Sequence, residues 1–318
     1  SLDTPESSGA IMRQVLSIGV PITLSNSAMS IINIIDTKIV MGRLQDALLL
    51  SEDAAAALNG QYRMAMDMPN MVASFVYPVT MSLIPFAAAA LARQDHAGAD
   101  RIISSAFRII AILALPAGIG LTGLAGPIIQ LLYPETNQEV GTQCLMVLGI
   151  ASIFVCIMMV CNSILQAHGF VNLPVLVMVL GGVLKIVTNY NLVVRPEVGI
   201  FGAPAGNILC FGLCLALDLL IISRVIPKRP RYLPIFVKPL AASALMGGAA
   251  WVVYRVLARL LSAVPEGGTE AVLSRMGNAV ATLAAIGVAM VVYLVLVVAL
   301  RAISREDLSL MPKGDKLA

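Results

Sequence analysis

Ionisable side chains within long apolar segments are the residues of this sequence that could do chemistry. Lys185 is the clearest case, because it lies in an apolar run ten residues before Arg195, which corresponds to about 15 Å along an α-helix. A charged side chain at the centre of a membrane-spanning helix costs about 2.5–3.5 kcal/mol. Since a lysine side chain is too short to reach water over that distance, we expect Lys185 to face an aqueous cavity or an acidic partner. A purely structural ion pair is the alternative.

Asp36 is the acidic residue best placed to act together with such a lysine. On a helical projection it lies on the shoulder of a polar stripe, beside Asn33. Lys38 falls on the other side of the helix and is expected to extend outward to water. Three roles for Asp36 stay open here: it could hold a cation, accept a proton or pair with Lys185.

Two further sets of charged residues lie in apolar surroundings. Arg63 and Asp67 are four residues apart, so on one helix they either neutralise each other or leave Arg63 to meet an anionic ligand. Asp218 is a weaker candidate for ion binding in a later apolar run.

The sequence lacks the residue patterns of known catalytic and metal centres. It has no Ser/His/Asp set, no HExxH, no Walker loop and no glycine-rich dinucleotide turn. Its five cysteines form no CxxC pair and are expected to be small buried residues, and its two histidines, His96 and His168, fall in expected loops. We therefore expect no enzyme, no metal site and no cofactor, with coupling to Na⁺ or H⁺ left open. A net charge of +3 is too small to indicate nucleic-acid binding.

The elements that must position these residues are membrane-spanning helices. Of the 318 residues, 58% are hydrophobic and 12% are charged, whereas soluble domains carry roughly 25% charged residues. The mean hydropathy is +0.90, and the apolar blocks reach the length of about 20 residues that a helix needs to cross a bilayer. These features exclude a soluble globular enzyme and predict an all-α, polytopic membrane helix bundle. The eight predicted spans are residues 13–42, 61–92, 102–132, 142–167, 172–194, 204–226, 239–262 and 277–300.

Polar residues follow one face of most of these spans. In the span over 13–42 they recur in steps of three and four residues, which places them on one side of a helix. Such stripes either line an aqueous cavity or join helices by hydrogen bonds. The last two spans are almost wholly apolar, so we expect them at the periphery of a six-helix lobe. The stripes comprise Thr23, Asn26, Ser30, Asn33 and Thr37; Arg63, Asp67, Asn70, Ser74 and Tyr77; Ser152, Cys156, Ser163 and Gln166; Gly181, Lys185 and Asn189; and Asn207, Cys210, Cys214 and Asp218.

The distribution of charge predicts the orientation and the division of the chain. With the N-terminus inside, the inner segments carry most of the lysine and arginine and the outer loops are acidic, so both termini are expected to be cytoplasmic. Residues 44–59 could form a small surface helix. The expected parts are a cytoplasmic linker over 1–12, a six-helix lobe over 13–226, a basic cytoplasmic loop over 227–238, two peripheral spans over 239–300 and a cytoplasmic tail over 301–318.

A series of characteristic runs extends along nearly the whole chain. They include SNSAMSIINIIDTKIVMGRL (25–44), GQYRMAMDMPNM (60–71), LPAGIGLTGLAGPIIQLLYP (115–134) and GGVLKIVTNYNLVV (181–194). Their order and spacing resemble the multidrug/oligosaccharidyl-lipid/polysaccharide (MOP) exporter superfamily, in particular the polysaccharide biosynthesis and stage V sporulation B-like flippases related to MurJ. Members of that superfamily have two six-helix lobes and two further helices. The resemblance is to the second lobe and the final pair, so we expect an N-terminal lobe in the whole protein.

The resemblance implies alternating access between the lobes and a cationic cavity that binds the diphosphate of a lipid-linked sugar. In MurJ-like members the final helix pair forms a groove for the lipid tail, and a cation site contains an acidic residue matched by Asp36 and an asparagine matched by Asn189. Val193 stands where that site has a further aspartate, so we favour an Asp36–Lys185 ion pair over sodium binding. The substrate-cavity candidates are Lys185, Arg63, Asn26, Asn33 and Asn70, and the ion-coupling or ion-pair candidates are Asp36, Asn189, Asp218 and Asp67.

These observations together predict a flippase of the bacterial inner membrane. Its expected cargo is a polyprenyl-diphosphate-linked cell-envelope precursor, with lipid II preferred, and its expected partners are membrane lipid and the N-terminal lobe. One alternative is a cation-coupled drug antiporter of the same superfamily. The other is a non-transporting membrane scaffold for envelope synthesis, which would gain nothing from a lysine buried at this depth.

Overall fold

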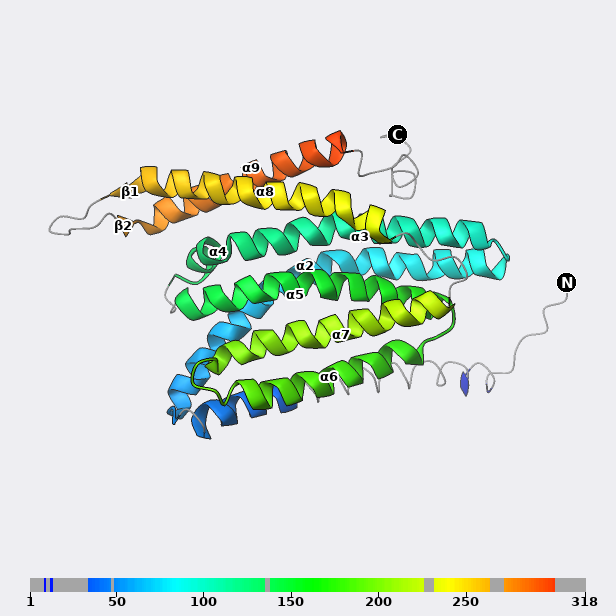
Figure 1. The fold of residues 1–318 in the computed structure, drawn as a ribbon, viewed down its shortest axis with the longest axis horizontal. Helices are drawn as coiled ribbons and strands as arrows, with labels where there is room; N and C mark the ends of the chain where they lie inside the picture. Colours follow the sequence, from blue (N-terminus) through cyan, green and yellow to red (C-terminus); the bar gives the residue numbers. More distant parts are fainter. Residues whose placement is uncertain are drawn as a thin grey trace.

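The computed structural model describes residues 9, 12–13, 34–46, 49–134, 138–225, 232–263 and 272–300. Residues 34–46 are helical and precede the first labelled helix in Figure 1. The elements that follow are α2 (Glu52–Ala92), α3 (His96–Gly123), α4 (Ala125–Leu132), α5 (Gln138–Ala167), α6 (Asn172–Leu192), the 3₁₀ turn η1 (Gly199–Phe201), α7 (Gly202–Val225), α8 (Tyr232–Leu261), β1 (Ser262–Ala263), β2 (Val272–Leu273) and α9 (Arg275–Ala299).

The predicted all-α membrane fold is confirmed. Among the described residues, seven helices are long and apolar enough to cross a membrane, and each corresponds to a predicted span. The first predicted span, 13–42, lies mostly outside the described residues, and its described end, 34–42, is helical. Asn26 and Asn33 lie outside the described residues. A short antiparallel pairing of β1 with β2 joins α8 to α9, which the sequence did not predict.

Helix α2 begins earlier than predicted, and the separate surface helix expected within 44–59 is wrong. Residues 52–59 form the first turns of α2 itself. Ser51 caps the helix by accepting a hydrogen bond from the Ala54 N–H, and Glu52 and Asp53 place negative charge at the helix N-terminus. Three prolines lie inside α2, at positions 69, 78 and 85, and Figure 1 shows the helix changing direction along its length, as internal prolines allow.

The predicted single span over 102–132 is two helices. Helix α3 ends at Gly123, and the short helix α4 begins at Ala125 after the residue Leu124. Pro127 supplies the physical reason, because it has no N–H to donate to the Gly123 carbonyl and its ring would clash with that carbonyl in a continuous helix. Within α4 the same proline lies in the first turn, where an N–H has no helical partner in any case.

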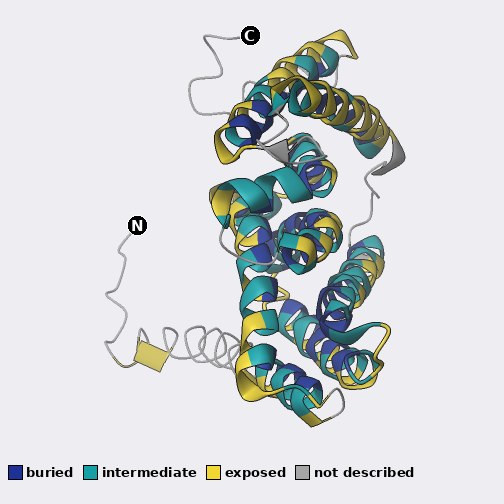
Figure 2. Ribbon diagram, turned by 90° about the vertical axis from the view of Figure 1, so that its left-hand side faces the viewer, coloured by how far each residue is buried: buried dark blue, intermediate teal, exposed yellow. Residues whose placement is uncertain are grey.

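The helices lie in a layered bundle with α5 near the middle. Helix α5 packs against α2, α3 and α7, and α6 packs against α7 on the far side (Figure 1). In Figure 2 the buried residues lie between the helices and the exposed residues lie on their outer sides. Most of the large residues exposed on α8 and α9 are apolar, as expected for helix faces in contact with lipid.

The last two long helices, α8 and α9, pack on each other and against the rest of the bundle at α3 and α4. Small residues, Ala242, Ala250, Ala285 and Ala289, let the two backbones approach closely. The few polar side chains of α9 point back to the bundle: Tyr293 Oη donates to the Ile112 carbonyl at 2.8 Å, and Asn278 Nδ2 donates to the Pro127 carbonyl at 3.2 Å. Hydrogen bonds thus fix this pair to one side of the bundle.

Candidate functional site

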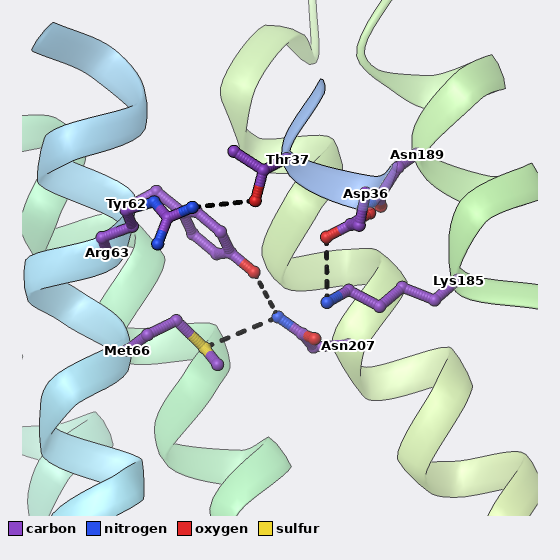
Figure 3. Close-up of polar contacts among 8 residues, drawn as sticks. All are labelled: Asp36, Thr37, Tyr62, Arg63, Met66, Lys185, Asn189 and Asn207. Atoms are coloured by element: carbon purple, nitrogen blue, oxygen red, sulfur yellow. Dashed lines mark hydrogen bonds and ion pairs between the residues drawn. The ribbon is translucent and has the colours of Figure 1, made fainter. Parts of the chain in front are cut away.

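Four helical segments bring polar side chains together inside the bundle. The segment 34–46, α2, α6 and α7 contribute to what we call the polar cluster (Figure 3). Every member is buried, so hydrogen bonds and an ion pair within the cluster replace contacts with water. The polar cluster comprises Asp36, Tyr62, Lys185, Asn189 and Asn207.

Asp36 is the centre of one half of the cluster. Lys185 Nζ lies 2.9 Å from Asp36 Oδ2, and Asn189 Nδ2 donates to Asp36 Oδ1 at 2.5 Å (Figure 3). Lys185 and Asn189 are one helical turn apart on α6, so both reach the same carboxylate from one helix face. All three are buried, with exposed fractions of 4% for Asp36, 8% for Lys185 and 0% for Asn189.

The ion pair is what makes the two buried charges tolerable. Moving an isolated charge out of water costs several kcal/mol even after the protein relaxes, and an opposite charge in direct contact offsets much of that penalty. The 2.9 Å distance between Lys185 Nζ and Asp36 Oδ2 is that of a direct ion pair. Of the roles open to Asp36 from the sequence, the structure therefore contains the pairing with Lys185.

Glycines allow α6 and α7 to approach closely beside this carboxylate. A Cβ at Gly206 of α7 would lie 2.1 Å from Asn189 Oδ1, well inside van der Waals contact. A Cβ at Gly181 of α6 would likewise lie 2.3 Å from the Cys214 sulfur. Gly206 therefore sets the position of Asn189, and through it the geometry at Asp36.

Tyr62 and Asn207 form the other half of the cluster. Asn207 Nδ2 donates to Tyr62 Oη at 2.6 Å and lies 3.6 Å from the sulfur of Met66 (Figure 3). Asn207 belongs to the same polar stripe of the sequence as Asp218. Nothing in that stripe distinguished Asn207 as a contact of Tyr62. Tyr62 gave no signal, because a tyrosine beside Arg63 in an apolar helix has the appearance of an ordinary interfacial residue.

Arg63 lies at the edge of the cluster and is exposed. Its Nη2 donates to Thr37 Oγ1 at 2.8 Å, and no ion pair joins it to Asp67 within the described part of the chain. The structure therefore contains a contact of Arg63 with Thr37 in place of a direct ion pair with Asp67, and binding of an anionic ligand by Arg63 stays a prediction. Asp67 and Asn70 are exposed on α2 and belong to no contact of the cluster.

Asp218 is buried at a second place in the bundle, apart from the cluster. Its exposed fraction is 0%, and neither carboxylate oxygen has a hydrogen-bond partner among the described residues. The neighbouring positions Leu217, Leu219 and Ile221 pack into apolar clusters with α5 and α6.

Comparison with known proteins decides the family. A sequence model described as "Lipid II flippase MurJ" matches residues 11–264, which is most of the chain. The chain belongs to the MurJ family. The protein "Uncharacterized membrane protein YabM" of Bacillus subtilis (strain 168) is 23% identical over 311 residues, which are 97% of this chain and 55% of that protein. The chain thus spans about half the length of the curated relative it matches.

Solved structures show that the fold is that of the MOP superfamily. An outward-facing multidrug resistance MATE family transporter of that superfamily aligns with a TM-score of 0.54 at 17% identity, over 93% of this chain and 66% of that one. A MOP superfamily transporter from Pyrococcus furiosus, titled for the reverse polarity of its binding pocket, aligns with a TM-score of 0.52 at 18% identity, over the same shares.

In this MurJ-family chain, the charge of Asp36 is balanced within the polar cluster. Within the described residues, no group of three or more histidine, cysteine or acidic residues could hold a metal ion. At Asp36 a cation is nevertheless present, because the Lys185 ammonium contacts the carboxylate that would otherwise require one. In this MurJ-family chain the positive charge is covalently tethered to α6.

Proposed function

We propose that this chain is part of a flippase that moves a polyprenyl-diphosphate-linked cell-envelope precursor across the bacterial plasma membrane by alternating access. Lipid II is the cargo we favour. The observation that carries the proposal is the buried Lys185–Asp36 pair within membrane-spanning helices of a MurJ-family chain. In this proposal both termini lie in the cytoplasm, and the chain works together with an N-terminal lobe of the whole protein.

The charges of the site suit an anionic cargo. Lys185 and Arg63 are the cationic groups of the site, and they lie on either side of the Asp36–Thr37 segment. Arg63 is exposed on α2, so its guanidinium is available to a diphosphate, which arginine binds through paired hydrogen bonds. A diphosphate near the cluster would compete with Asp36 for Lys185.

That competition supplies a coupling between cargo and conformation. While Lys185 is bound to Asp36, the segment 34–46 is joined to α6, and Asn189 adds a second bond between the same two elements. An anion that draws Lys185 away leaves Asp36 with Asn189 alone, which weakens that connection. We propose that this exchange, rather than binding of an external sodium ion, links the cargo to movement of the helices.

The test is translocation by the whole protein in lipid vesicles. The probe is fluorescent lipid II placed in one leaflet, with its arrival in the other leaflet measured by a quencher that cannot cross the membrane. We expect translocation by the wild type and its loss in Lys185→Met. Lys38→Met is the matched control, because Lys38 is exposed on the segment that carries Asp36. Wild-type protein that moves no lipid II, or full activity in Lys185→Met, would contradict the proposal.

The second candidate is a cation-coupled drug antiporter. It is favoured by the likeness of fold to a multidrug resistance MATE family transporter and by the exposed acidic residue Asp67 on α2. The same vesicles loaded with a fluorescent organic cation distinguish the two. Export of the dye that is lost in Asp67→Asn and unaffected by lipid II would favour the antiporter over the flippase.

A further inference from the structure

Asp218 is a buried carboxyl group that the site described above does not use. It lies on α7, sixteen residues after Gly202 and seven before Val225, and it is 0% exposed. Within the described part of the chain, both of its oxygens lack a hydrogen-bond partner. It differs in this from Asp36, whose two oxygens are both engaged.

Among the residues that the structure describes on the elements packed against α7, none offers a neutralising charge to Asp218. Helix α7 packs against α5, α6 and η1, and the one basic side chain on those three elements, Lys185, is bound to Asp36 at 2.9 Å. Arg224, on α7 itself, is exposed. Residues 14–35 of the sequence contain no ionisable side chain, so this stretch has no counter-charge to offer either. The remaining titratable groups on these elements are Glu139, Cys144, Cys156 and Cys161 of α5, Tyr190 of α6, and Cys210 and Cys214 of α7.

An ionised carboxylate in these surroundings would be very unfavourable. Burial of an unpaired charge costs so much that such a group takes up or loses a proton instead. A neutral carboxyl group has no net charge to desolvate, and its cost is that of a buried polar group, about 1–3 kcal/mol on mutational scales. The burial and the missing partners therefore favour the protonated form.

We propose that Asp218 is a proton-binding site of the bundle, separate from the Asp36–Lys185 pair. The ligand is a single proton, which converts the carboxylate to the neutral carboxyl group and leaves no unpaired charge among α5, α6 and α7. Because the group is fully enclosed, release of the proton requires α7 to move away from α5. The site does not depend on which cargo the protein carries.

The experiment is difference infrared spectroscopy of the whole protein in lipid vesicles at pH 7. A protonated carboxyl group has a carbonyl stretch that a carboxylate lacks. We expect that band in the wild type, and we expect Asp218→Asn to remove it. Glu197→Gln is the matched control, since Glu197 is an exposed carboxylate in the turn between α6 and η1. Its spectrum should keep the band.

Two further measurements keep the proposal testable if the variant folds poorly. Wild-type protein labelled with ¹³C at aspartate carboxyl groups should show the same band shifted to lower frequency. Transfer to D₂O should shift the band slowly, because the proton is enclosed. Absence of a protonated aspartate band at pH 7, or a D₂O shift complete within the mixing time, would overturn the proposal.

Discussion

Two buried aspartates on different helices have different surroundings, and their burial is accommodated in different ways. Asp36 is 4% exposed and contacts both the Lys185 ammonium and the Asn189 amide, whereas Asp218 is 0% exposed and contacts neither a cation nor a hydrogen-bond donor of the described residues. The first is suited to a permanent negative charge and the second to a neutral carboxyl group. The same residue type therefore has opposite charge requirements at two places in one bundle.

The two sites also differ in their effect on helix packing. The Asp36 pair joins segment 34–46 to α6, so a change of its charge alters a contact between two elements. Asp218 lies within the apolar packing of α5, α6 and α7 and joins nothing through hydrogen bonds. A substitution that removes charge should therefore be costly at the first site and mild at the second.

The largest effect is expected from breaking the ion pair on one side. Lys185→Met leaves Asp36 buried without a cation, and removal of one partner of such a pair costs about 3–5 kcal/mol. We expect a clear decrease of the thermal unfolding midpoint, measured in detergent micelles with the whole protein. Lys38→Met should leave the midpoint unchanged. An equal decrease in both variants would show that Lys185 contributes no more to stability than Lys38 does.

A double substitution sharpens the assignment of the partner. If Asp36 and Lys185 stabilise each other, then Asp36→Asn combined with Lys185→Met should cost less than the sum of the single effects, with a coupling of about 0.5–3 kcal/mol. The three variants and the wild type form the thermodynamic cycle, read by thermal unfolding. Strictly additive effects would mean that the two residues act separately.

A smaller effect is expected at the glycine that positions Asn189. In Gly206→Ala the new methyl group would overlap Asn189 Oδ1, so Asn189 must move away from Asp36. Overpacking of this kind costs about 1–3 kcal/mol. Gly212→Ala on the same helix is the control, because its added Cβ would meet nothing closer than 3.9 Å. Equal stability of the two alanine variants would contradict this prediction, because it would mean that α7 shifts to accommodate the methyl group at no cost.

The smallest effect is expected at Asp218. Asparagine has nearly the shape of a protonated aspartate and carries no charge, so Asp218→Asn should change the free energy of unfolding at pH 7 by less than about 1 kcal/mol. Asp36→Asn, measured beside it, should cost more because it removes the counter-charge of Lys185. A larger loss at Asp218 than at Asp36 would reverse the comparison.

The sequence predicted the membrane fold and the unusual position of Lys185 because both depend on local properties. A single lysine within an apolar run is visible without knowledge of any other helix, and so is a block long enough to cross a bilayer. The break at Leu124 and the early start of α2 at Glu52 depend on a proline and a capping serine, which are also local signals.

What the sequence could not provide is the register between helices. Tyr62 contacts Asn207 across 145 positions of sequence, and nothing in the period of either helix indicates that they meet. The interpretation of Arg63 and Asp67 as a neutralising pair used spacing within one helix, whereas Arg63 turns to Thr37 on another segment. For the same reason the polar stripes could not show that Asp218 lies apart from Asp36.

We propose that the tethered Lys185 ammonium at Asp36 takes the place of an external cation. The most direct measurement is lipid II translocation by the whole protein in vesicles, with sodium present and with sodium replaced by choline. We expect equal rates under the two conditions for the wild type and loss of translocation under both in Lys185→Met. A wild-type rate that requires sodium, together with an active Lys185→Met variant, would contradict it.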